Sequence, residues 1–131
     1  MKRIVSVLIL TAMIFCCSGC GISFTAVKTI DDSGIYSKEE IKEAMDIVCR
    51  EIEKSEGYIL LKLEYDEEFS KKQMKYYEEQ YDADEAIVLR SKFFVSKETE
   101  GALEKGETAK WSWILVRDKN GPWELMDAGY P

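Results

Sequence analysis

The sequence predicts an α+β fold, in which one long N-terminal helix packs on a curved antiparallel sheet of about four strands. Three observations lead to this fold class. Residues 38–54 repeat apolar side chains at the three-four spacing of a helix. Several later stretches alternate with the two-residue period of a half-buried strand. The order is helix, strand, short helix and three strands, so one helix face and one sheet face can bury each other as an α+β roll.

The helix start is marked by the stretch YSKEEI, residues 36–41. Ser37 is placed to cap the helix, Glu40 to complete a capping box, and Tyr36 to pack against Ile41 as a hydrophobic staple. Gly57 marks the end of the helix. The expected buried face consists of Ile41, Ala44, Met45, Val48, Cys49 and Ile52.

The next two elements are a strand over residues 58–66 and a second, shorter helix over residues 71–80. The strand alternates, with Lys62, Glu64 and Asp66 expected on the solvent side. The segment FSKKQM, residues 69–74, repeats the spacing of the first helix start, so we expect Ser70 to be the cap, Gln73 to close the box and Phe69 to staple to Met74. The side chains expected to face the core from the strand are Ile59, Leu61, Leu63 and Tyr65.

Three further strands complete the predicted fold. Residues 85–96 alternate, with Arg90 and Lys92 pointing outward, and a connection over 97–107 leads to a strand over 108–117. The turn Asp118-Lys119-Asn120-Gly121 then returns the chain as a hairpin into a strand over 123–127. The inward residues of the first of these strands are Ile87, Leu89, Ser91, Phe93 and Val95.

The N-terminus has the pattern of an export signal. Lys2 and Arg3 precede an apolar stretch over residues 4–15, and small residues follow. The segment resembles a bacterial lipoprotein signal whose lipobox is Cys17-Ser18-Gly19-Cys20, although Cys17 stands where leucine is usual. This resemblance implies a signal peptide over 1–19, a lipidated Cys20 with a flexible tether over 20–35, and a roll domain over 36–131.

Two other interpretations of the N-terminus remain open. Residues 4–24 are uncharged and close to the length of a membrane-spanning helix, so an uncleaved anchor is an alternative. The cluster of Cys16, Cys17 and Cys20 is also compatible with a disulfide or metal site. In either anchored case Lys2 and Arg3 stay on the cytoplasmic side and the body is exported.

Composition excludes several chemistries. The chain has no histidine, which excludes a Cys-His dyad, a Ser-His-Asp triad and any histidine-ligated zinc site. Its formal net charge is −7, and loss of Lys2 and Arg3 with the signal makes the body more acidic still. A nucleic-acid partner is therefore not expected. The negative charge is compatible with a body held away from anionic lipids, which would leave the acyl group as the only membrane contact, but an acidic surface that serves solubility is the favoured explanation. Cys49 is expected to pack in the core.

A candidate binding site is formed by Trp111, Trp113, Arg117 and Trp123 on two paired strands. Aromatic side chains with a cation can line a concave ligand site, and they equally serve as ordinary cross-strand packing. The acidic segment 82–85 lacks the glycine and distal glutamate of a calcium loop, so we expect a solvated turn there. No catalytic residue, metal or cofactor is expected.

Three stretches carry a family resemblance: QYDADEAIVL (80–89), WSWILVR (111–117) and PWELMDAGY (122–130). With the lipobox and the first helix start, they resemble a family of small lipoproteins of Gram-positive bacteria, similar in architecture to the cystatin-like and NTF2-like rolls. The resemblance offers no catalytic motif to transfer.

Together these observations predict a lipoprotein of the cell membrane, anchored on its extracytoplasmic face, whose body is a non-catalytic binding module. Its partners would be the membrane, through the lipid anchor, and an envelope protein or small ligand. An envelope enzyme using carboxylate or tyrosine chemistry in a roll pocket, and a purely structural envelope component, are the alternatives.

Overall fold

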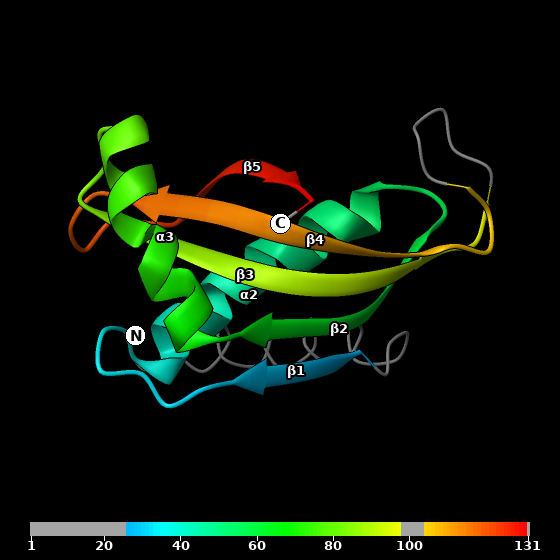
Figure 1. Cartoon of the computed structure of the whole chain (residues 1–131), viewed down its shortest axis with the longest axis horizontal. Helices are drawn as coiled ribbons and strands as arrows, with labels where there is room; N and C mark the ends of the chain where they lie inside the picture. Colours follow the sequence, from blue (N-terminus) through cyan, green and yellow to red (C-terminus); the bar gives the residue numbers. More distant parts are fainter. Residues whose placement is uncertain (1–25, 98–103, 131) are drawn as a thin grey trace, which may run out of the picture.

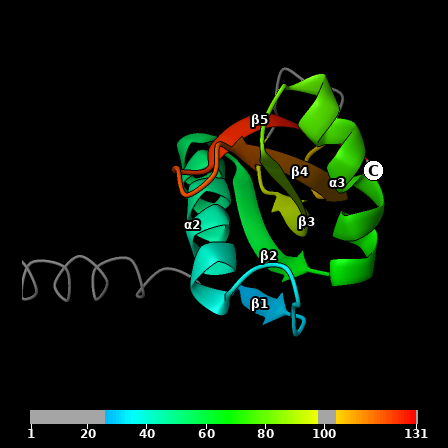
Figure 2. The same cartoon turned by 90° about the vertical axis from the view of Figure 1, so that its left-hand side faces the viewer.

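The computed structural model describes residues 26–97 and 104–130 and shows an α+β fold with two helices and a five-stranded, mostly antiparallel sheet. The strands lie in sequence order in the sheet, and only β1 is parallel to its neighbour. The two helices lie on opposite sides of the sheet, which curves around α2 (Figures 1 and 2). The elements are β1 (Val27–Ile30), α2 (Lys38–Lys54), β2 (Tyr58–Tyr65), α3 (Glu67–Gln80), β3 (Glu85–Val95), β4 (Thr108–Arg117) and β5 (Glu124–Gly129).

The expected count of four strands is wrong because β1 adds a fifth, inside the segment expected to be a tether. Its residues, Val27–Ile30, pair in parallel with Lys62–Tyr65 of β2. A strand therefore precedes the long helix, which is not the first element of the fold. Four residues are too few to show an alternating pattern, and this strand is held by the edge of β2, which the local sequence does not reveal.

Helix α2 spans Lys38–Lys54, as predicted, and its capping box is confirmed. The Glu40 amide donates to the Ser37 hydroxyl at 3.2 Å, and the Ser37 amide donates to the Glu40 carboxylate at 3.0 Å. The buried face of the helix packs on the inner face of the sheet, where the main core lies. Its buried members are Ile41, Ala44, Met45, Val48 and Ile52.

In β2 the predicted alternation fails at its first half. The pairing with β3 shifts between Leu60 and Lys62, which marks a β-bulge. Leu60 is buried at 8% exposure, whereas Leu61 is 40% exposed and Ile59 is exposed as well. An extra residue in one strand reverses the faces on one side of it, so only Leu63 and Tyr65 face the core as expected.

Helix α3 begins four residues earlier than predicted, at Glu67, and Asp66 is its cap. The Asp66 carboxylate accepts from the Phe69 amide at 3.2 Å. Ser70 was expected in this role, but it is fully buried and accepts a hydrogen bond from the Val88 amide at 3.0 Å. The earlier start also places Lys71 away from the helix N-terminus, where positive charge is unfavourable.

The edge of β3 that extends past β2 is completed by two side chains. The last residue of β2 that pairs with β3 is Glu64, opposite Arg90. In the part of β3 before Arg90, the Ser70 hydroxyl accepts a hydrogen bond from the Val88 amide, and the Tyr36 hydroxyl donates to the Ala86 carbonyl at 2.8 Å. Buried backbone groups require such partners, so these two side chains replace a missing strand.

The predicted signal peptide over 1–19, and Cys20, lie outside the described residues. Within residues 26–97 and 104–130, neither helix combines the length and the apolar character that a membrane crossing requires.

Candidate functional site

The four residues proposed as a binding site do not form one site. They separate into two pairs, one along the inner face of β4 and one where the end of β4 meets the turn before β5, and three of the four are almost completely buried. Trp111 and Trp113 lie together with ring centroids 5.8 Å apart. Arg117 lies over Trp123, with its guanidinium carbon 4.2 Å from the ring centroid.

The first pair belongs to an aromatic part of the core. Trp113 donates from its indole nitrogen to the Ser91 hydroxyl at 2.7 Å. Trp111 packs edge-on against Phe93 at 4.9 Å and against Tyr58 at 6.2 Å between centroids. These contacts are those of cross-strand packing, and neither indole belongs to the lining of the depression described below.

Arg117 joins three elements at the other end of the sheet. Its guanidinium donates to Glu85 of β3 at 2.8 and 3.0 Å and also to the second carboxylate oxygen of Glu40 in α2. The side chain is only 8% exposed, so a soluble ligand has little access to it. Arg117 is therefore a clamp between the helix and the sheet.

Electrostatics at this clamp favour the charged forms. Burial acts to lower the pKa of Arg117, but the hydrogen bonds to Glu40 and Glu85 outweigh it and the pKa is raised. The pKa of Glu40 is lowered, first by the hydrogen bond from the Ser37 backbone and then by the one from Arg117. The capping-box pattern around Glu40 does not reveal the bond to Arg117, because the two residues are 77 positions apart.

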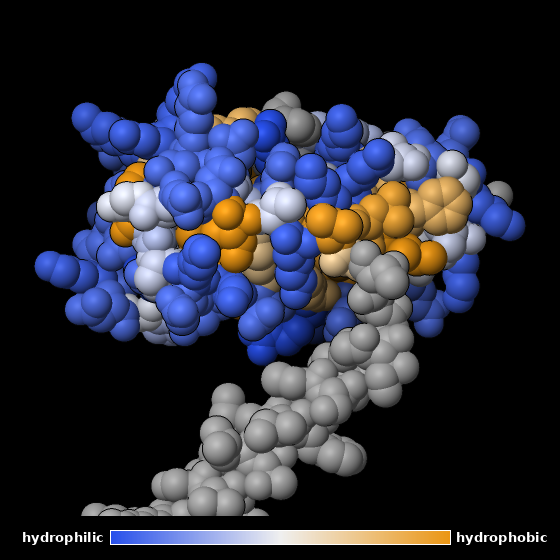
Figure 3. All heavy atoms as spheres, turned by 90° about the horizontal axis from the view of Figure 1, so that it is seen from below, coloured by the Kyte–Doolittle hydropathy of each residue, from blue (hydrophilic) through white to orange (hydrophobic). Residues whose placement is uncertain are grey.

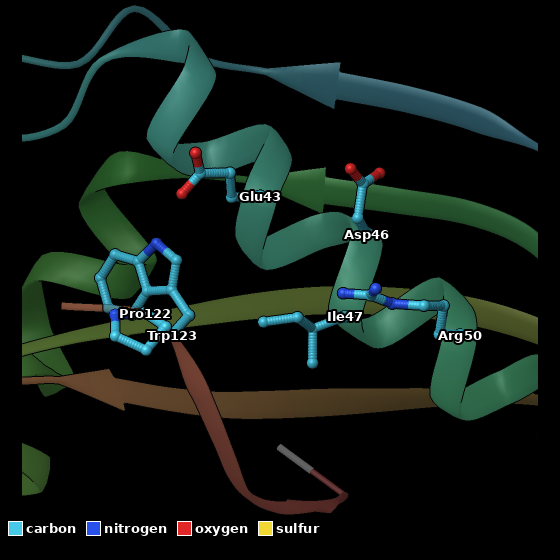
Figure 4. Close-up of a pocket in the computed structure, with 6 residues that line it drawn as sticks. All are labelled: Glu43, Asp46, Ile47, Arg50, Pro122 and Trp123. Carbon is cyan, nitrogen blue, oxygen red and sulfur yellow. The ribbon is translucent and has the colours of Figure 1, made fainter. Parts of the chain in front are cut away.

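One surface depression lies beside Trp123, between α2 and the turn that precedes β5 (Figure 4). Its volume is about 260 Å³. Figure 4 shows Pro122 and Trp123 at one end and Arg50 at the other. The full lining is Glu43, Asp46, Ile47, Arg50, Pro122 and Trp123.

The depression has mixed charge and an apolar floor. The indole N–H of Trp123 is already used, since it donates to the Glu40 carbonyl at 3.0 Å. The polar groups left for a ligand are two carboxylates and one guanidinium on exposed helix positions. This arrangement suits contact with a polar surface, and it is not the enclosed, mostly apolar cavity that small-molecule sites usually have.

The remaining candidates have structural roles. Asp84 accepts from the Lys119 amide at 2.8 Å, which ties the turn before β3 to the β4–β5 turn, and Glu85 is held by Arg117. In the part of the chain that the structure describes, no three histidine, cysteine or acidic side chains converge as a metal site would require. Cys49 packs against the core while half-buried, and burial raises the pKa of its thiol.

No protein-family model, curated protein or solved structure matches this chain.

Proposed function

We propose that this protein is a lipoprotein anchored through Cys20 on the extracytoplasmic face of the cell membrane, and that its body is a non-catalytic binding module of the envelope. The observation that carries the proposal is the N-terminal sequence, in which a charged start and an apolar stretch lead to Gly19-Cys20. Strand β1 begins at Val27, seven positions after Cys20.

Within the α+β class, the architecture that we propose is a roll of the cystatin-like and NTF2-like kind. It is supported by the single long helix α2, which lies across the sheet on the side toward which β1 and β5 curve (Figure 2). The extra strand β1 and the second helix α3, on the outer face, are additions to that plan.

A binding role is supported over catalysis by how the ionisable side chains near the core are used. Arg117, Glu40 and Glu85 hold the helix to the sheet, and the Tyr36 hydroxyl completes the β3 edge. Each of these groups is engaged in the fold. The accessible groups beside the depression are the ordinary charged residues of an exposed helix face, which suits a partner that contacts the surface.

The proposal is tested by the intact mass of protein extracted from membranes. We expect the mass of residues 20–131 plus acyl chains, because cleavage before Cys20 removes the signal and the thiol receives the lipid. The Cys20→Ala variant should keep its full length and lack the acyl adduct.

Cys16→Ala is the matched control, since it changes a neighbouring cysteine that cleavage discards. It should give the same mature mass as the unaltered protein. A full-length mass without an acyl adduct in the unaltered protein would contradict the proposal and support a membrane-spanning helix over residues 4–24.

A further inference from the structure

Three lysines form a row across the outer face of the sheet, on the side away from α2. Lys62 of β2 lies directly opposite Lys92 of β3, and Lys92 lies directly opposite Lys110 of β4. All three side chains are exposed. Neighbouring strands are about 4.8 Å apart, so the row places three positive charges within roughly 10 Å.

This row is unfavourable for the isolated protein. Like charges directly opposite each other destabilise a sheet, and one step along the same strands Glu64 lies opposite Arg90 as a pair of opposite charges. Lys62 is partly compensated by Glu64 at 3.5 Å. Among the described residues Lys92 and Lys110 take part in no ion pair. In a chain with a formal net charge of −7, such a concentration of positive charge indicates an anionic partner.

Apolar side chains adjoin the row. Ile59 and Phe94 are cross-strand partners at the next outward positions, and Val27 of β1 lies opposite Lys62. Val27 is 56% exposed, and Leu61 in the bulge is exposed as well. Figure 3, which looks onto the β1 edge, shows hydrophobic side chains gathered along this edge among charged ones. Apolar side chains beside lysines are typical of surfaces that bind at a membrane interface.

The proposed anchor lies close to this face. Val27 lies seven positions after Cys20, and a fully extended chain covers about 3.4 Å per residue, which limits the distance to about 24 Å. The tether expected from sequence was twice as long, because it included β1. With β1 in the sheet, a lipid on Cys20 keeps the Val27 end of the sheet near the bilayer.

We propose that the outer face of the sheet docks on the anionic phospholipid headgroups of the membrane, with Lys62, Lys92 and Lys110 contacting phosphates and Val27 and Ile59 reaching the interface. This inference rests on the proposed lipidation of Cys20. It replaces the hypothesis that negative charge holds the body away from anionic lipids, because the relevant quantity is the charge of the face presented. The exposed acidic residues of α2, such as Glu43 and Asp46, lie on the opposite side of the sheet.

Helix α3 shares the outer face but covers its other end. It packs on β3 and on one end of β4 (Figure 1). Lys92 and Lys110 lie toward the other end, near the end of β3 and the start of β4. The helix has three lysines and four glutamates, so it adds no net positive charge to this side, and Lys72 is paired with Glu68 at 3.6 Å. The positive charge of this face therefore lies in the lysine row, and the docked orientation places this row toward the bilayer.

The test uses the acylated mature chain, residues 20–131, which is identified by its intact mass and inserted in vesicles. One vesicle is phosphatidylcholine alone and the other is equal parts of phosphatidylcholine and phosphatidylglycerol. Lysine acetylation by a soluble amine reagent is then followed by mass spectrometry at each position. We expect Lys62, Lys92 and Lys110 to react at least about fivefold more slowly in the anionic vesicles, since each lysine held at an anionic surface strengthens attachment by about that factor.

Lys38 and Lys42, on α2, are the internal controls and should react equally in both vesicles. The protection should disappear in 1 M salt, where the screening length falls to about 3 Å.

Two double variants distinguish the effect of where the lysines lie from the effect of the net charge of the protein. Lys92→Gln with Lys110→Gln should abolish the protection of Lys62, whereas Lys38→Gln with Lys42→Gln removes the same charge from the other face and should leave it intact. All four positions are exposed, so both variants are expected to fold, and near-ultraviolet circular dichroism checks this.

The outcomes distinguish the two proposals. A mass without an acyl adduct overturns the lipoprotein assignment itself. Acylated protein whose three lysines react equally in both vesicles overturns the docking. Protection that depends on protein density and occurs equally in neutral vesicles assigns the face to a second copy of the chain, and this also overturns the docking.

Discussion

At the scale of single residues, Arg117 shows how one side chain can determine the position of an element. It lies at the end of β4, binds Glu85 on the adjacent strand, and reaches Glu40 in the first turn of α2. Its guanidinium also covers the ring of Trp123. The alternating pattern of the strand predicted the face on which Arg117 lies, but its partners come from distant parts of the chain, so its role as a clamp could not be predicted.

Replacing Arg117 with methionine should lower the free energy of unfolding by about 2–3 kcal/mol, because it leaves Glu40 and Glu85 without their buried partner. Urea unfolding measures this change. Arg90→Met is the matched control: Arg90 also binds two carboxylates, Glu64 and Asp66, but is 36% exposed, and more exposed ion pairs contribute about 1 kcal/mol or less.

The pH dependence gives a second check on the same variant. A carboxyl group whose pKa is lowered on folding contributes stability above its unfolded pKa, and this contribution is lost as the pH falls through the folded value. Glu40 has such a lowered pKa. The difference between Arg117→Met and the unaltered protein should therefore be full at neutral pH and shrink below about pH 4.3. A difference that is the same at acid and neutral pH would contradict the clamp.

At the scale of elements, features that depend on neighbouring residues were predicted well, whereas features that depend on contacts between distant residues were not. The bounds and capping box of α2 follow from neighbouring residues, which is why the sequence predicts them. The bulge in β2 does not, because four consecutive apolar residues, Tyr58 to Leu61, fit either face. Ser70 matched a cap by spacing, but Asp66 competed for that role and Ser70 instead binds Val88 of β3.

The bulge in β2 and simple alternation lead to opposite predictions of which leucine, Leu60 or Leu61, contributes more to stability. Leu60→Ala should lower the free energy of unfolding by about 2–3 kcal/mol because it removes buried methyl groups. Leu61→Ala should change it by less than about 1 kcal/mol, since this residue is 40% exposed whereas Leu60 is buried. Urea titration of the two variants, which differ by one position, distinguishes the two registers. A larger loss for Leu61→Ala would show that the strand has no bulge.

At the scale of the whole molecule, the alignment of the lysine row on the outer face depends on the pairing register of the strands. The alternating pattern placed Lys62 and Lys92 outward, but only the pairing of three strands aligns them with Lys110. The proposed site on the inner face was assembled from the same kind of pattern, and there the structure separates its four residues into two pairs. Faces can thus be inferred from a sequence, whereas neighbours across strands require the fold.

β1 is the edge of the sheet, and its removal should change the association state. A chain of residues 31–131 exposes the backbone groups of β2 beside the already exposed Leu61, and exposed edges pair with other chains. We expect it to self-associate in sedimentation velocity, whereas the matched chain of residues 26–131 stays monomeric at the same concentration. A monomeric shorter chain of equal stability would show that β1 does not protect this edge.

The position of β1 also has a mechanical consequence. Any tension between the N-terminal segment and the body acts first on this four-residue strand, which is held by the backbone of β2 and by the hydrogen bond from Asp31 to Tyr65. Under load β1 would detach before α2 or the central strands, because the core residues that hold those elements lie beyond β1 from the point where the force acts. Its release would lengthen the link by about 14 Å, so β1 would act as an extensible element that protects the rest of the fold from force.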